Sequence, residues 1–184
     1  MKVACDWDVS PFFGWGVYGL NLALEWSHGD AGVESWTYGK VWLDGVDALR
    51  ARALRPFLQR CRRQPEQFDV RLRALGNSLA GTEALGDSDA DVGVIFFEMP
   101  LSAAAVARAK RFELIITGSS WNEQVLRARG VENVCTVLQG VDPTLFHPAP
   151  RRGLFPGKFV IFSGGKAEPR RRMKQRRIDA LQHG

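Results

Sequence analysis

Three glycines near the amino terminus have a spacing that suits a ligand-binding turn. Gly14, Gly16 and Gly19 follow a short apolar segment, residues 2–7, and precede residues with helical periodicity. Glycine lets a backbone approach a ligand closely, and the start of a helix attracts anions. The spacing Gly14-x-Gly16-x-x-Gly19 therefore predicts a dinucleotide or phosphate loop. A tight turn that packs a helix against a sheet would explain the same residues.

A carboxylate follows the most clearly buried segment of the sequence. Glu98 ends residues 92–98, an apolar run typical of a buried strand, and Pro100 comes shortly after it. A carboxylate at the end of a strand can orient a substrate hydroxyl or take part in proton transfer. A local cap or salt bridge would explain Glu98 equally well, so both interpretations stand.

Ser119 is a second candidate at the end of a strand. Ser120 and Glu123 have the spacing of a capping box, so we expect Ser120 to cap the next helix. That assignment leaves Ser119 to face a ligand crevice.

Two later segments also carry candidate site residues. Asp142 lies in residues 139–148, whose glycine and prolines indicate turns, and it either caps a turn or faces the crevice. Gly164 and Gly165 end an apolar segment and are followed by Lys166 and other cations. This arrangement predicts a diphosphate cradle, or else a solvated run of charge.

Other kinds of site have little support in the sequence. No serine or cysteine pairs with an evident base, so a hydrolytic triad is not expected. The cysteines, Cys5, Cys61 and Cys135, are far apart and predict free thiols in a reducing compartment rather than a metal site or disulfides. We expect no metal and no cofactor.

The elements that position these residues alternate along the chain. Strands are predicted at residues 2–7, 68–75, 92–98, 113–117, 134–138 and 159–162, and one strand with an irregular neighbour within 32–43. Helices are predicted at 17–26, 47–63, 102–112 and 120–129. Such alternation predicts a doubly wound α/β domain, whose mostly parallel sheet has helices on both faces. Pro56 should kink or break its helix. Arg71 and Arg73 alternate with apolar residues, which predicts a strand with one solvated face near a sheet edge.

The charge of the chain is concentrated at its end. The chain has 25 basic and 20 acidic residues, a net charge of +5. Residues 166–184 hold seven basic and two acidic side chains, 7 − 2 = 5, so residues 1–165 are neutral, with 18 of each. This distribution argues against specific nucleic-acid binding. The sequence has neither a membrane-spanning run nor a signal peptide, so we expect a cytoplasmic protein whose basic tail can contact a membrane peripherally.

Four segments together resemble a known enzyme family. Residues 14–23, 117–122, 139–148 and 159–166 are similar to the amino-terminal half of retaining GT-B glycosyltransferases of the group 1, family 4 type, which include glycogen-synthase-like and sucrose-synthase-like enzymes. The likeness covers about residues 1–171. It implies two facing Rossmann-like domains, of which the first binds a sugar acceptor and the second a nucleotide-diphosphate sugar.

The resemblance also implies roles for particular residues. Gly14, Trp15, Gly16 and Gly19 match the loop near the donor phosphates and the transferred sugar. Lys166 and Arg171 match the basic pair that grips the donor diphosphate.

The sequence departs from the family after this pair. Arg172 stands where the family has a glycine, and the donor domain does not follow. We therefore expect residues 1–165 to be the acceptor-side domain and residues 166–184 to be a remnant of a truncated, frame-shifted or split gene product, inactive alone. The alternatives are a free-standing Rossmann-type nucleotide-binding module and a non-enzymatic interaction protein with an apolar docking face.

Overall fold

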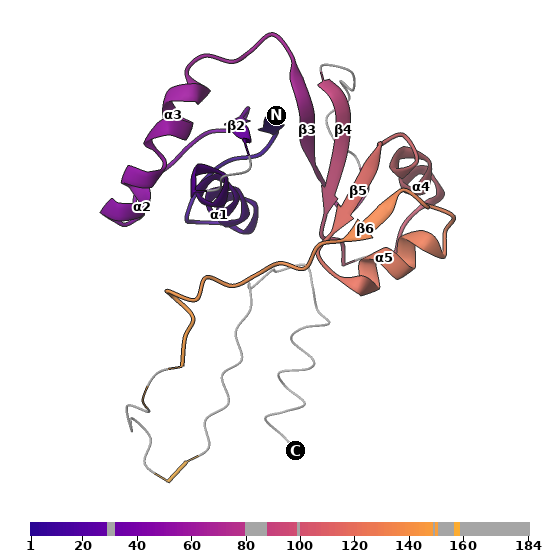
Figure 1. Cartoon of the computed structure of the whole chain (residues 1–184). Helices are drawn as coiled ribbons and strands as arrows, with labels where there is room; N and C mark the ends of the chain where they lie inside the picture. Colours follow the sequence, from indigo (N-terminus) through magenta and orange to yellow (C-terminus); the bar gives the residue numbers. More distant parts are fainter. Residues whose placement is uncertain (29–31, 80–87, 99, 149, 151–156, 159–184) are drawn as a thin grey trace. The chain divides into compact units, whose positions relative to one another are not determined.

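The computed structural model of the chain describes residues 1–28, 32–79, 88–98, 100–148, 150 and 157–158. The chain divides into two compact units, Met1–Gly140 and Val141–Gly184. Every helix and strand that the structure describes belongs to the first unit (Figure 1). The domain boundary expected after residue 165 and the strand expected at 159–162 lie outside the described residues.

The first unit is built on a six-stranded sheet in the order β2-β1-β3-β4-β5-β6, and every neighbouring pair is parallel. Its strands are β1 (Lys2–Cys5), β2 (Glu34–Thr37), β3 (Phe68–Leu75), β4 (Ser88–Ile95), β5 (Leu114–Thr117) and β6 (Val134–Thr136). The predicted parallel α/β fold is confirmed. β4 both begins and ends earlier than the strand predicted at 92–98.

Helices cover both faces of the sheet, so the unit is doubly wound and Rossmann-like. They are α1 (Gly14–His28), α2 (Ala48–Ala53), α3 (Arg55–Cys61), α4 (Ala103–Ala109) and α5 (Ser120–Arg127). On one face, Tyr18, Leu22 and Trp26 of α1 pack in the same cluster as the strand residues Cys5 and Val94. On the other face, α4 and α5 bury Ala105, Ala109 and Leu126 against residues of β3, β4 and β5.

The helix predicted at residues 47–63, with a kink or a break expected at Pro56, forms two helices. The Asp47 side chain caps α2 by accepting hydrogen bonds from the N–H groups of Leu49 and Arg50, both at 3.1 Å. Leu54 separates α2 from α3, and Pro56 stands in the first turn of α3. Proline has no N–H to donate, so it is tolerated in a first turn but ends a helix that reaches it from the amino-terminal side.

The prediction for β3 was right in its bounds and wrong in its environment. β3 pairs with β1 on one side and β4 on the other, so it is a central strand. Arg71 is 7% exposed and Arg73 is 0% exposed, although their alternation predicted a solvated face. The Arg71 guanidinium stacks 3.8 Å from the centroid of the Tyr38 ring, and Arg73 pairs with Asp91. Burial and the neighbouring Arg73 charge lower the pKa of Arg71.

The direction of winding reverses at β1. The chain passes from β1 to β2 on one side of the sheet and then returns to place β3 on the other side of β1. The carboxyl ends of β1 and β3 therefore form the topological switch point of the sheet. In open α/β sheets, ligands bind outside the strand ends at such a point.

Candidate functional site

Because all six strands are parallel, the segments that follow them lie along one edge of the sheet, which we call the carboxyl edge. Three predicted site segments are there: the start of α1 follows β1, Glu98 follows β4, and Ser119 follows β5. Asp142 belongs to the second unit, and Lys166 and Arg171 lie outside the described residues. The fold thus brings part of the predicted site to one edge.

The glycine motif forms the first turns of α1 rather than a loop before it. α1 begins at Gly14, earlier than its apolar periodicity predicted. A β-carbon at Gly16 would lie 2.7 Å from Cβ of Ser10, and one at Gly19 would lie 2.8 Å from the carbonyl oxygen of Asp8. These two glycines therefore let α1 pack closely on the segment after β1. A β-carbon at Gly14 would meet no neighbouring atom within 4 Å, so open space adjoins it.

Four aromatic residues, Trp7, Trp15, Tyr18 and Phe96, form an aromatic cluster at the start of α1. The Trp15 ring centroid lies 5.2 Å from those of both Trp7 and Phe96. Tyr18 packs edge-on against Phe96 at 5.6 Å. Trp7 is buried, and the other three are half-buried. The cluster joins the segment after β1 to the segment after β4 and leaves aromatic surface partly exposed.

The packing of this cluster leaves one polar group unsatisfied. Nε1 of Trp7 is buried and has no hydrogen-bond partner in the described part of the chain. It lies 2.9 Å from where a β-carbon of Gly19 would stand, so the indole is pressed against α1. Burial raises the pKa of the Tyr18 hydroxyl.

Sequence reasoning found only Trp15 of the aromatic cluster. Trp7, Tyr18 and Phe96 were interpreted as ordinary strand or helix residues. Aromatic residues directly follow two strands, β1 and β4, that end at the same edge of the sheet. This pattern could have indicated the cluster. Pairing those two segments requires the sheet order, which local patterns do not contain.

Glu98 is exposed at the carboxyl edge, and its backbone is held from the neighbouring strand. Its N–H donates to Oδ1 of Asn77, which follows β3, at 3.3 Å. The next residue, Ser78, accepts a hydrogen bond at its carbonyl oxygen from Nε of Arg108 in α4, at 3.2 Å. The turn after β3 therefore positions the Glu98 segment.

The capping prediction for α5 was wrong by one residue. Ser119 is the N-cap, and its hydroxyl oxygen accepts from the Asn122 N–H at 3.2 Å. Asn122 is buried and donates from Nδ2 to the carbonyl oxygen of Phe97 at 2.9 Å. The Ser119 side chain, expected to face the crevice, thus has a structural role in starting α5.

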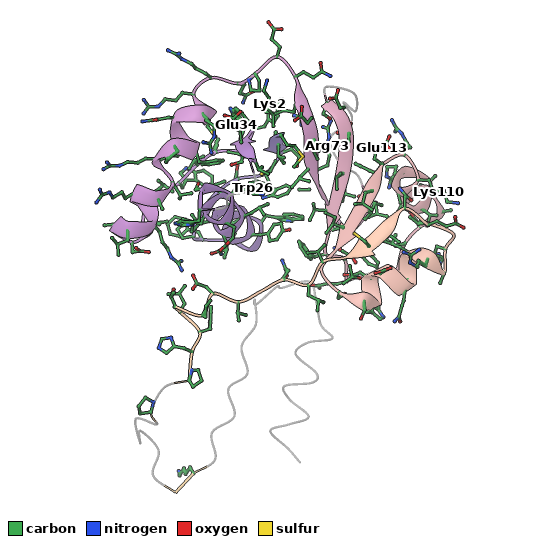
Figure 2. The ribbon with its side chains drawn as sticks, viewed as in Figure 1. Lys2, Trp26, Glu34, Arg73, Lys110 and Glu113 are labelled. Carbon is green, nitrogen blue, oxygen red and sulfur yellow. The ribbon has the colours of Figure 1, made fainter. Side chains whose placement is uncertain are left out.

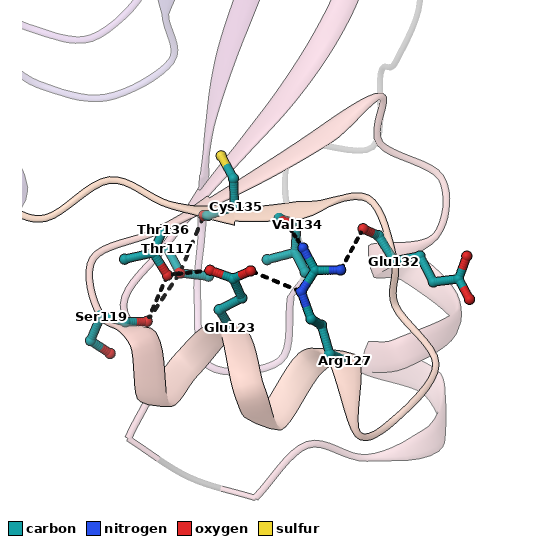
Figure 3. Close-up of polar contacts among 8 residues, drawn as sticks. All are labelled: Thr117, Ser119, Glu123, Arg127, Glu132, Val134, Cys135 and Thr136. Carbon is teal, nitrogen blue, oxygen red and sulfur yellow. Dashed lines mark hydrogen bonds and ion pairs between the residues drawn. The ribbon is translucent and has the colours of Figure 1, made fainter.

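Glu123, predicted to complete the capping box, instead joins α5 to β6 (Figure 3). Its carboxylate accepts from Oγ1 of Thr136 at 2.5 Å and from Nε of Arg127 at 2.8 Å. Arg127 also donates from Nη2 to the carbonyl oxygen of Val134 at 2.6 Å. These hydrogen bonds hold the pKa of Glu123 below its ordinary value. The network therefore connects α5 to β6.

Asp142 forms a local turn in the second unit. Its Oδ1 accepts from the N–H of Thr144 at 2.8 Å and from the Thr144 hydroxyl at 2.6 Å. Its carbonyl oxygen accepts from the Phe146 N–H at 2.8 Å. The turn predicted from the Asp-Pro sequence is confirmed.

Several other features bear on the kind of site. Among the described residues, no group of three or more His, Cys, Asp or Glu side chains is placed to hold a metal ion. None of the described helices is both long enough and apolar enough to span a bilayer. All three cysteines are free, as predicted.

Comparisons with protein-family models, with curated proteins and with solved structures found no match. The chemistry proposed for this chain therefore rests on its own geometry and on the sequence resemblance.

Proposed function

We propose that the first unit is the acceptor-side domain of a glycosyltransferase that transfers a sugar from a nucleotide-diphosphate sugar to an acceptor hydroxyl. The observation that carries the proposal is the position of Gly14, Trp15 and Gly16. They start α1 at the switch point between β1 and β3, where ligands of parallel α/β sheets bind.

The start of α1 offers groups suited to a sugar nucleotide. The first N–H groups of a helix have no partner within the helix, and the helix dipole favours negative charge there. Gly14 adjoins open space, so a phosphate or sugar can approach its backbone. Preorganised N–H donors of this kind stabilise the charge that develops on a leaving diphosphate.

The acceptor would bind beside the aromatic cluster and Glu98. Half-buried rings such as Trp15 and Phe96 offer flat apolar surface for the face of a sugar ring. The exposed Glu98 carboxylate is our candidate to orient the acceptor hydroxyl or accept its proton. Both groups lie at the carboxyl edge, after β1 and β4.

Catalysis in the proposed class needs a second domain that binds the nucleotide, with Lys166 and Arg171 as the proposed contacts to the diphosphate. We propose a cytoplasmic location. Without that second domain, the first unit alone is expected to turn over no sugar nucleotide, and robust turnover by the purified first unit would contradict this part of the proposal.

A free-standing dinucleotide-binding module is the weaker alternative. Such modules place an acidic residue at the end of the second strand to bind ribose hydroxyls. Here β2 ends at Thr37 and continues with Tyr38, Gly39 and Lys40, none of which is acidic.

Titration of isotope-labelled protein with UDP-, GDP- and ADP-sugars, followed by amide NMR, tests the proposal. We expect at least one of them to shift the amide signals of Gly14, Trp15 and Gly16. Gly14→Val should weaken this binding without lowering thermal stability, because its side chain enters open space. Ala103→Val, at the first position of α4, is the matched control and should bind as the wild type does.

The outcomes separate the candidate functions. Absence of shifts at α1 with every sugar nucleotide would exclude the proposed donor contact. Shifts produced by NAD and not by sugar nucleotides would favour the dinucleotide module. Equal binding by Gly14→Val and wild type would place the ligand away from α1.

A further inference from the structure

Positive charge is concentrated in one part of the first unit. Residues 38–63 carry seven basic and two acidic side chains, 7 − 2 = 5, although residues 1–165 as a whole are neutral. This segment runs from the end of β2 through α2 and α3. In Figure 2, side chains tipped with nitrogen extend from α2 and α3 away from the sheet. The neutral residues 1–165 therefore include a basic surface, formed by residues 38–63.

α2 lies at this surface with an apolar side chain facing solvent. None of its residues is buried. Leu49 is 79% exposed, and Arg52 of the same helix and Arg55 at the start of α3 are also exposed. An exposed leucine among exposed arginines combines the two kinds of side chain that bind an anionic bilayer interface.

Exposed aromatic side chains continue this surface at the start of α1. Phe12 is 67% exposed, and Phe13 and Trp42 are each about two-fifths exposed. Phe13 and Trp42 contact each other edge to face, with ring centroids 6.2 Å apart. Lys40 Nζ lies 5.8 Å from the Trp42 ring centroid. Trp42 thus connects the aromatic residues of the β1–α1 segment to the basic segment.

The basic and aromatic parts belong to one packed assembly. Leu20 and Leu24 of α1 share a buried cluster with Leu54 and Phe57. Leu54 lies between α2 and α3, and Phe57 belongs to α3. The exposed side chains are therefore carried on fixed elements.

We propose that this aromatic–basic surface docks the first unit on an anionic lipid bilayer. The surface consists of the apolar residues Phe12, Phe13, Trp42 and Leu49 and the basic residues Lys40, Arg52 and Arg55. The arginines are attracted to anionic headgroups, while the aromatic rings and Leu49 enter the boundary between headgroups and acyl chains.

The mixture of groups favours a bilayer over other polyanions. Nucleic acid attracts the cations through its phosphates, and its bases stack on aromatic rings, but it offers no general gain for burying Leu49. A bilayer interface binds both the cations and the apolar side chains, because it presents anionic charge directly above an apolar layer. This inference is independent of the proposed transferase activity.

Vesicle flotation of the full chain tests the inference. We expect the protein to float with phosphatidylcholine vesicles that contain phosphatidylglycerol, less so in high salt, and not with phosphatidylcholine alone. Phe12→Ser combined with Leu49→Ser should lower this binding. Arg52→Gln combined with Arg55→Gln should lower it by roughly tenfold or more, because each cation near an anionic surface contributes about fivefold.

Matched controls keep the inference falsifiable. Leu138→Ser removes a leucine that is 74% exposed after β6. Lys110→Gln combined with Arg111→Gln removes two exposed cations at the end of α4. These controls should bind vesicles as the wild type does. Failure of the wild type to float would overturn the inference. Normal flotation of Phe12→Ser/Leu49→Ser would also overturn it. So would a loss of vesicle binding in the Lys110/Arg111 variant equal to that in the Arg52/Arg55 variant, because it would show general electrostatic attraction.

Discussion

Nε of Arg73 lies 2.5 Å from Oδ1 of Asp91, and the Arg73 side chain has no exposure to solvent. The two residues come from adjacent central strands, β3 and β4. A guanidinium within a sheet loses its hydration and is stable there only with charged or polar partners. The pair therefore explains how a strand with alternating arginines occupies the middle of the fold.

The first prediction concerns this pair. Asp91→Ala leaves a buried guanidinium without this carboxylate, and we expect a loss of about 3–5 kcal/mol in the free energy of unfolding. Urea denaturation measures it. Asp89→Ala, an exposed carboxylate in the same strand, should change the unfolding free energy by about 0.5 kcal/mol or less. Similar midpoints for the two variants would show that the Arg73–Asp91 pair contributes little.

The second prediction compares the contributions of Gly16 and Gly14 to the stability of the protein. Gly16→Ala places a β-carbon 2.7 Å from Cβ of Ser10 and should destabilise the protein. We expect a cost of about 1–3 kcal/mol, typical of overpacking. Gly14→Ala has space for its methyl group and should be neutral or stabilising by up to about 1 kcal/mol. Thermal unfolding followed by circular dichroism distinguishes them, and a larger loss for Gly14→Ala would contradict the geometry.

The third prediction is a pH dependence from Glu123. Hydrogen bonds from Thr136 and Arg127 lower its pKa below the ordinary value of 4.5. The carboxylate is favoured in the folded state, so its contribution is fully present above pH 4.5 and is lost as the pH falls through the lower folded pKa. The wild type should therefore lose more stability on acidification than Glu123→Gln.

Urea denaturation at a series of pH values below neutrality checks this difference. Glu113→Gln, a change at an exposed glutamate, is the control and should follow the wild-type curve. Parallel pH curves for wild type and Glu123→Gln would mean that the hydrogen bonds seen at Glu123 do not favour its ionised form.

The fourth prediction concerns thiol reactivity. Burial, with a smaller effect from the Asp6 charge, raises the pKa of Cys5, so its reactive thiolate is scarce. Cys5 is also only 2% exposed, whereas Cys135 is half-buried. Iodoacetamide should modify Cys135 before Cys5 in the native protein, and Cys5 only after unfolding. Peptide mapping by mass spectrometry checks the order, and rapid native labelling of Cys5 would contradict it.

Local sequence patterns were enough to predict most elements of the first unit. The bounds of β3 and the interruption of the helix at Pro56 follow from interactions among residues close in the chain. Alternation of strands and helices was also enough to predict a parallel, doubly wound sheet. The sequence alone therefore predicts that the residues following each strand lie at one edge of the sheet.

Tertiary structure decided which residues meet at that edge and which are buried. The aromatic cluster forms because the segments after β1 and β4 approach each other, although they are distant in the sequence. Ser119, rather than Ser120, caps α5, and its partner Asn122 is in turn hydrogen-bonded to the segment after β4. Arg71 and Arg73 looked solvated because alternation gives the period of a strand but not what covers each face. Pairing partners, packing and burial arise from long-range contacts, so they were settled only when the sheet was assembled.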